Sequence, residues 1–229
     1  MMRHILLRLV VVTLCASLTA MGGGCVNLGK GTQETTKFYV LHSMSGLKAE
    51  TQTTLDRDDL TIGVGPVKFP PYLDRPQIVT RTSPNELDFA TFAWWAEPLD
   101  ENFSSVLAEN LSVLLSMDAV EVYPWRLSVP VDYQVAMNVT RFDGTPGGDV
   151  SLDVRWTILG DDGNEVLLSR TSSFIEHAGK PPDYEAIVSA QSRVVEALSH
   201  DIAMAIKAIE QGAPLGMADD KKHSNTTND

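Results

Sequence analysis

Cys25 is the residue with the most specific predicted chemistry in this chain of 229 residues. It follows three glycines at positions 22–24, which themselves follow an apolar run from Ile5 to Leu18. Small residues leave the backbone open to a signal peptidase, and a cysteine thiol can take up a diacylglycerol group. We therefore predict that the chain is cleaved before Cys25 and that Cys25 carries a lipid anchor.

Residues 1–24 have the features of a secretory signal peptide. Arg3 and Arg8 give it a charged beginning, and the apolar run is shorter than the ~20 residues that span a membrane. The approach to the cysteine resembles a bacterial lipobox, although Gly22 stands where that pattern prefers Leu. Val26 follows the cysteine where an inner-membrane retention signal often places Asp, which favours the outer membrane. The alternative is a plain secretory peptide with an incidental cysteine.

The charge and the thiols of the mature chain exclude several classes of function. Removal of residues 1–24 leaves 205 residues with 16 basic and 30 acidic side chains, a net charge of −14. Such an acidic chain without a basic cluster is a poor candidate for binding nucleic acid, and we expect membrane contact through the anchor. Cys15 leaves with the signal peptide and Cys25 is acylated, so no thiol remains for a disulfide, a metal or catalysis.

Other sequence signatures of catalysis are missing. The chain contains no G-x-S-x-G, H-E-x-x-H or G-x-x-x-x-G-K-[ST] motif. The histidines of the mature chain have no spacing typical of metal ligands. They are His42, His177, His200 and His223. We predict a protein that is not an enzyme and that has no metal or other cofactor.

The mature chain divides into a flexible tether at 25–36, a folded domain at 37–211 and a disordered tail at 212–229. Strands are predicted at 38–41, 60–70, 76–82 and 86–96, and further strands within 133–144 and 149–174. Ser83-Pro84-Asn85 and Asp162-Gly163 are predicted turns.

Two amphipathic helices complete the predicted domain. The first is expected to begin at Asp100 as N-cap, with Asn110 interrupting its apolar face and bonding to a neighbouring backbone. The second begins at Asp183 and ends near Gly212. Its apolar stripe includes Ile187, Val194, Leu198 and Ile202.

Alternating apolar and polar residues in the strands, as at Leu152, Val154, Trp156 and Ile158, indicate a sheet covered on one side. The predicted fold is α+β, a mainly antiparallel sheet with two helices packed on one face.

Four aromatic residues are predicted to bind a partner: Phe69, Tyr72, Trp94 and Trp95. Trp94 and Trp95 are neighbours in a predicted strand and must point to opposite faces. One of them is therefore a candidate for a buried contact with another protein, since aromatic residues are enriched at interfaces. The alternative is a tryptophan that lies under a loop or helix end of its own domain.

Several segments together resemble the ABC-type transport auxiliary lipoproteins, the family typified by paraquat-inducible protein C. They are "FYVL" after the lipobox, "IGVGPVKFPPYLDRPQIVTR", "WWAEPLDENFSSVLAENLSVLL", "YPW", the strand ending "VTRFDG" and the closing helix. The resemblance extends from Phe38 to Ile209, and it departs at Trp94, where the family commonly has Arg.

The resemblance implies a non-catalytic lipoprotein of the outer membrane that faces the periplasm. Its expected partners are a mammalian-cell-entry (MCE) domain protein and an inner-membrane transporter component, which together move lipids between the two membranes. A homo-oligomer is left open. The alternative function is a lipoprotein that activates or scaffolds an enzyme of cell-wall synthesis. A third, a periplasmic hydrolase, lacks every motif it would need.

Overall fold

The computed structural model describes residues 35–44, 60–125, 130–145, 147–179 and 183–213. The predicted signal peptide, Cys25, the tether up to residue 34 and the tail from residue 214 lie outside the described residues. The elements are β1 (Lys37–Tyr39), β2 (Ile62–Lys68), η2 (Pro71–Leu73), β3 (Gln77–Ser83), β4 (Glu86–Trp95), α2 (Leu99–Leu115), β5 (Val120–Val122), β6 (Tyr133–Gly144), β7 (Asp149–Gly160), η3 (Asp161–Gly163), β8 (Glu165–His177) and α3 (Tyr184–Glu210). Here η marks a short 3-10 helix. The predicted α+β class is confirmed.

The strands form one eight-stranded mixed sheet in the order β1-β4-β3-β6-β2-β5, with β7 beside β6 and β8 beside β7. The pairs β3–β4, β6–β7 and β7–β8 are antiparallel, and turns were predicted for the first and the last of them. The pairs β1–β4, β2–β5, β2–β6 and β3–β6 are parallel. The prediction of a mainly antiparallel sheet was therefore wrong for the pairings of β1, β2 and β5 and for the pairing of β3 with β6.

The parallel part was missed because turn signals report only on strands that are neighbours in the sequence. β2 pairs with β6, which lies about seventy residues further along the chain, as in the pair Ile62 and Tyr133. The burial pattern of β2 is consistent with its place between parallel neighbours. Four consecutive residues, 62–65, are buried, and continuous burial is typical of a strand covered on both faces in a parallel sheet.

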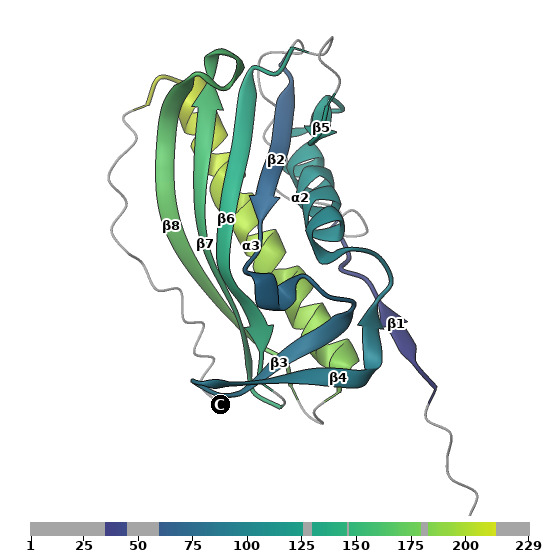
Figure 1. Cartoon of the computed structure of the whole chain (residues 1–229). Coiled ribbons are helices and arrows are strands. Elements are labelled where there is room, and N and C mark those ends of the chain that lie inside the picture. Colours follow the sequence, from purple (N-terminus) through teal and green to yellow (C-terminus); the bar gives the residue numbers. More distant parts are fainter. Residues whose placement is uncertain (1–34, 45–59, 126–129, 146, 180–182, 214–229) are drawn as a thin grey trace, which may run out of the picture. The chain divides into compact units, whose positions relative to one another are not determined.

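Both helices cover the same face of the sheet. The ring of Phe103 in α2 packs edge to face on Phe142 of β6, with centroids 5.6 Å apart. A Cβ added at Gly144, two residues further on, would lie 3.1 Å from a methyl group of Ile187 in α3. Alternate residues of a strand share a face, so α2 and α3 lie on one side. Figure 1 shows α3 behind β6, β7 and β8, with α2 beside β2.

The beginning of α3 follows the prediction, whereas the beginning of α2 does not. Asp183 caps α3, and its Oδ1 accepts a hydrogen bond of 2.7 Å from the amide of Ala186. In α2 the N-cap is Pro98, whose carbonyl accepts from the amide of Asn102 at 3.0 Å. Asp100 therefore lies inside the first turn, where a negative charge still interacts favourably with the helix dipole. Its prediction as N-cap was wrong.

Two buried asparagines of α2 hold the segment that follows β1. Asn102 accepts from the amide of Leu41 at 2.7 Å, and Asn110 accepts from the amide of Met44 at 2.8 Å. Asn110 also donates to the hydroxyl of Ser199 in α3 at 3.0 Å. The predicted backbone contact of Asn110 is thus confirmed. β1 ends at Tyr39, earlier than predicted. The amide of Leu41 donates its hydrogen bond to Asn102 of α2 and not to a neighbouring strand.

Candidate functional site: a cleft between two motifs

The two most specific sequence segments, "PPYLDRPQIV" and "WAEPLD", meet in space. The chain bends at η2, where the amide of Leu73 donates to the carbonyl of Pro70 at 2.9 Å. Just beyond this bend the amide of Trp95 donates to the carbonyl of Pro76 at 2.7 Å. The β3–β4 hairpin thus returns the second segment to the side of the first.

Between these segments lies a cleft of about 550 Å³, which we call the motif cleft. Its floor is apolar, because Leu73, Trp95 and Leu99 are buried in the core around it. Val67 and Phe69 form a half-buried apolar wall. Clefts with apolar floors and a few polar groups at the edge are the usual form of a binding site.

The edge of the motif cleft carries three carboxylates and one guanidinium group. Asp74, Glu97 and Asp100 are exposed, and Arg75 lies among them. Glu97 accepts a hydrogen bond of 2.6 Å from the side-chain amide of Asn102, so its carboxylate is fixed at the beginning of α2. The excess of negative charge favours a ligand with a positive group beside an apolar one.

Arg75 has an unusual environment for a cation. Its guanidinium carbon lies 3.9 Å from the centroid of the Phe89 ring, which gives a cation–π contact. Its Nε is buried and donates to no acceptor in the described part of the chain. Leaving such a donor unpaired costs free energy, which a hydrogen-bond acceptor brought in by a ligand can recover.

A buried ionic cluster supports the η2 wall. The side chain of Asp143 is fully buried and lies 2.8 Å from Nη2 of Arg81 and 2.9 Å from Nε of Arg141. The hydroxyl of Tyr72 donates to the same carboxylate at 3.1 Å. Burial alone would raise the pKa of Asp143, but the hydrogen bonds and charges of the two arginines outweigh it and lower that pKa.

The pKa of Tyr72 is shifted in the opposite direction, upward. Burial and the negative charge of Asp143 raise the pKa of its phenol, so it remains a neutral donor. Both oxygens of the buried Asp143 carboxylate thus accept hydrogen bonds from within the domain. The cluster ties η2, β3 and β6 together, and it serves as a support for the cleft rather than a reactive site.

The structure separates the four predicted partner-binding aromatics. Phe69 lines the motif cleft and packs edge to face on Phe103, with centroids 5.3 Å apart. Tyr72 belongs to the Asp143 cluster. The prediction that Trp94 and Trp95 point to opposite faces is confirmed, since Trp95 is only 6% exposed while Trp94 is half-buried.

Trp95 is therefore packed inside its own domain, which agrees with the alternative interpretation for that residue. It forms part of the floor of the motif cleft. The role of the four aromatics in partner binding stays a prediction. The four charged residues of the cleft were not predicted as site residues, although all of them stand within the two motifs that carry the resemblance: Asp74, Arg75, Glu97 and Asp100.

Two further observations concern the described part of the chain. It contains no group of three or more His, Cys, Asp or Glu side chains that could hold a metal ion. None of its helices combines the length and the apolar character needed to cross a membrane.

Comparison with known proteins gives a family and a fold. The family model described as ABC-type transport auxiliary lipoprotein component matches residues 39–203. An uncharacterized protein of known crystal structure is 24% identical, with a TM-score of 0.61, over 76% of this chain and 99% of the other. A protein from Xanthomonas campestris is 17% identical, with a TM-score of 0.57, over 78% and 97%. No curated protein sequence matches the chain.

Proposed function

Because the chain belongs to the family of ABC-type transport auxiliary lipoproteins, we propose that it is a non-catalytic, lipid-anchored component of an intermembrane lipid transport system. In this proposal Cys25 carries the acyl chains, the anchor lies in the outer membrane, and the domain faces the periplasm. Its partners are an MCE-domain protein and the inner-membrane transporter component. The family match carries the proposal, since it covers most of the folded domain.

The motif cleft is the surface that we propose for contact with the MCE-domain protein. Its apolar floor can take an apolar side chain of the partner, and its carboxylates can pair with a neighbouring Lys or Arg. This position agrees with the prediction for Phe69, which lines the cleft. It also explains why the two motifs share one site, because each supplies one wall.

Site-specific photo-crosslinking tests this proposal. A photoreactive amino acid replaces Asp74 at the edge of the cleft, and in a control protein it replaces Glu109, an exposed residue further along α2. In native membranes we expect a crosslink to an MCE-domain protein from position 74 and none from position 109. The crosslinked partner is identified by mass spectrometry.

A charge reversal provides an independent measurement. Asp74→Lys places a cation at the cleft edge and should weaken recovery of the MCE-domain protein roughly tenfold, which corresponds to a loss of about 1.4 kcal/mol of binding free energy. Glu109→Lys is the matched control and should leave recovery unchanged. Recovery of a peptidoglycan synthase with no MCE-domain protein would favour the cell-wall alternative instead.

A further inference from the structure

Three aromatic side chains form an exposed patch on the outer side of β1 and β4. Phe38 is 63% exposed and Phe92 is 42% exposed, and Trp94 is half-buried beside them. In the sheet Phe38 is paired with Trp94, and their rings meet edge to face with centroids 6.4 Å apart. We call Phe38, Phe92 and Trp94 the outer aromatic patch.

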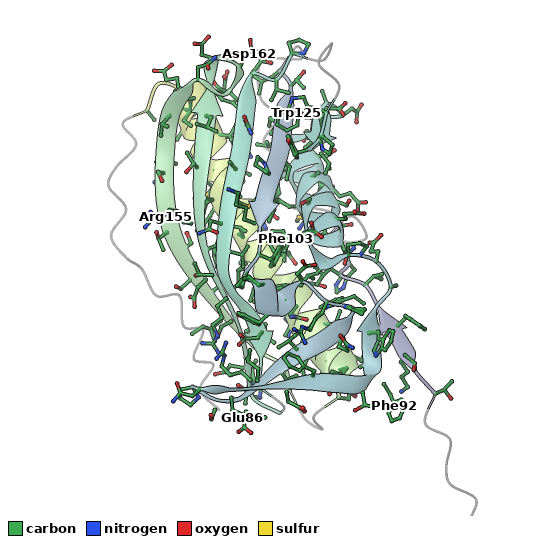
Figure 2. The ribbon with its side chains drawn as sticks, viewed as in Figure 1. Glu86, Phe92, Phe103, Trp125, Arg155 and Asp162 are labelled. Atoms are coloured by element: carbon green, nitrogen blue, oxygen red, sulfur yellow. The ribbon has the colours of Figure 1, made fainter. Side chains whose placement is uncertain are left out.

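The three side chains share one face, which is the face opposite the core. Side chains alternate along β4, and Ala93 and Trp95 are buried while Phe92 and Trp94 point outward. Figure 2 shows Phe92 at the corner of the domain, away from Asp162 at the β7–β8 turn. Clustered exposed aromatics of this kind mark a surface that another body covers.

The position of the patch in the sequence, close to Cys25, indicates that a membrane holding the anchor lies within its reach. Cys25 and Lys37 are twelve residues apart in the sequence. A fully extended chain of this length spans about 40 Å, and a flexible one spans about 20 Å on average. Once Cys25 is in a bilayer, the patch meets the membrane surface at a very high local concentration.

The charges beside the patch select the kind of lipid. A shallow groove next to Phe38 is lined by one cation, Lys37, and by two carboxylates, Asp183 and Glu185. The excess of one negative charge in this groove disfavours anionic headgroups. Zwitterionic headgroups fit it, because their ammonium group can approach the carboxylates while the aromatic rings enter the interfacial layer.

We propose that the outer aromatic patch lies in the headgroup layer of the membrane that holds the anchor, against zwitterionic phospholipid. The contact fixes one side of the domain toward the bilayer instead of leaving it free on its tether. This inference rests on the lipidation of Cys25, which is part of the proposed function, and it requires no protein partner.

Fluorescence quenching in vesicles tests the inference. The protein is purified from membranes, and its intact mass must show acylated Cys25, which leaves an introduced cysteine as the single free thiol. An environment-sensitive dye is attached at Phe92→Cys, and in a control protein at Val166→Cys on β8, which is 63% exposed. Both proteins are placed in phosphatidylcholine vesicles that contain brominated lipid. We expect roughly twofold or stronger excess quenching at position 92.

Two further measurements test the roles of the aromatic side chains and of the lipid headgroup. The double substitution Phe38→Glu with Trp94→Glu should remove the excess quenching at position 92 without releasing the protein, because the acyl anchor still holds it. Replacing much of the phosphatidylcholine with anionic phosphatidylglycerol should reduce the quenching at 92.

Equal quenching at positions 92 and 166 would overturn the inference. So would an unacylated Cys25, or crosslinks between copies of this chain at position 92 with no quenching, which would assign the patch to a second copy. The vesicles contain no partner protein, so failure here is independent of the crosslinking result at the motif cleft.

Discussion

Replacing Asp143 with asparagine should destabilise the domain more than any change at an exposed carboxylate. Asp143→Asn keeps the shape of the side chain but removes the negative charge that faces Arg81 and Arg141. Breaking a buried ion pair typically costs ~3–5 kcal/mol, because it leaves a charge without compensation. The arginine side chains are 21% and 34% exposed, so water can partly hydrate them after the change. We therefore expect a loss of about 2–3 kcal/mol, or roughly 4–12 °C in Tm.

The effect has a defined dependence on pH. The pKa of Asp143 in the folded state lies below the ordinary value of 3.8. A carboxyl group with a lowered folded-state pKa stabilises the fold above its unfolded pKa, and this stabilisation is lost as the pH falls through the folded pKa. The gap between the wild type and Asp143→Asn should thus be full near pH 7 and shrink below about pH 4.

Urea unfolding at a series of pH values measures this gap. Asp149→Asn is the matched control, because the side chain of Asp149 is 61% exposed, and it should stay within about 0.5 kcal/mol of the wild type. An Asp143→Asn protein as stable as the wild type at pH 7 would refute the assignment of the cluster as a support. A gap that is the same at pH 7 and pH 3 would show that packing, and not charge, causes the loss.

Three other predictions concern the anchor and the core. The protein extracted from membranes should have lost residues 1–24 and gained acyl chains by intact mass, and Cys25→Ser should leave the membrane fraction. Leu198→Ala should cost ~2–5 kcal/mol in urea unfolding, since Leu198 is fully buried in α3. Trp95→Ala should cost ~3–5 kcal/mol, whereas Trp94→Ala should lower Tm far less because Trp94 is half-buried; equal losses would contradict the assigned faces.

The sequence predicts best where a signal is local. The Asp183 cap and the buried stripe of α3 follow from residues within a few turns of each other, and both are confirmed. The same holds for the β3–β4 hairpin at Ser83-Pro84-Asn85 and for the β7–β8 turn at Asp162-Gly163. In each case the residues that specify the structure are neighbours in the chain.

The prediction fails where distant segments decide the structure. β5, three residues long, was not predicted, because it depends on pairing with β2 rather than on its own pattern. The parallel pairing of β1 with β4 was also missed, although both strands were predicted. The motif cleft could not be assembled for the same reason, since its two walls meet only through the β3–β4 hairpin and the bend at η2.

β4 explains how one short segment can supply two different surfaces. Adjacent residues of a strand point to opposite faces, so Trp95 forms the floor of the motif cleft while Trp94 joins the outer aromatic patch. A partner in the cleft and a membrane at the patch would therefore contact opposite sides of the same strand. Because both side chains share one backbone, the orientation of the domain at the bilayer also sets the direction in which the cleft opens. An acyl group at Cys25 alone would not impose this direction, because it would fix one end of the chain and not a face of the domain.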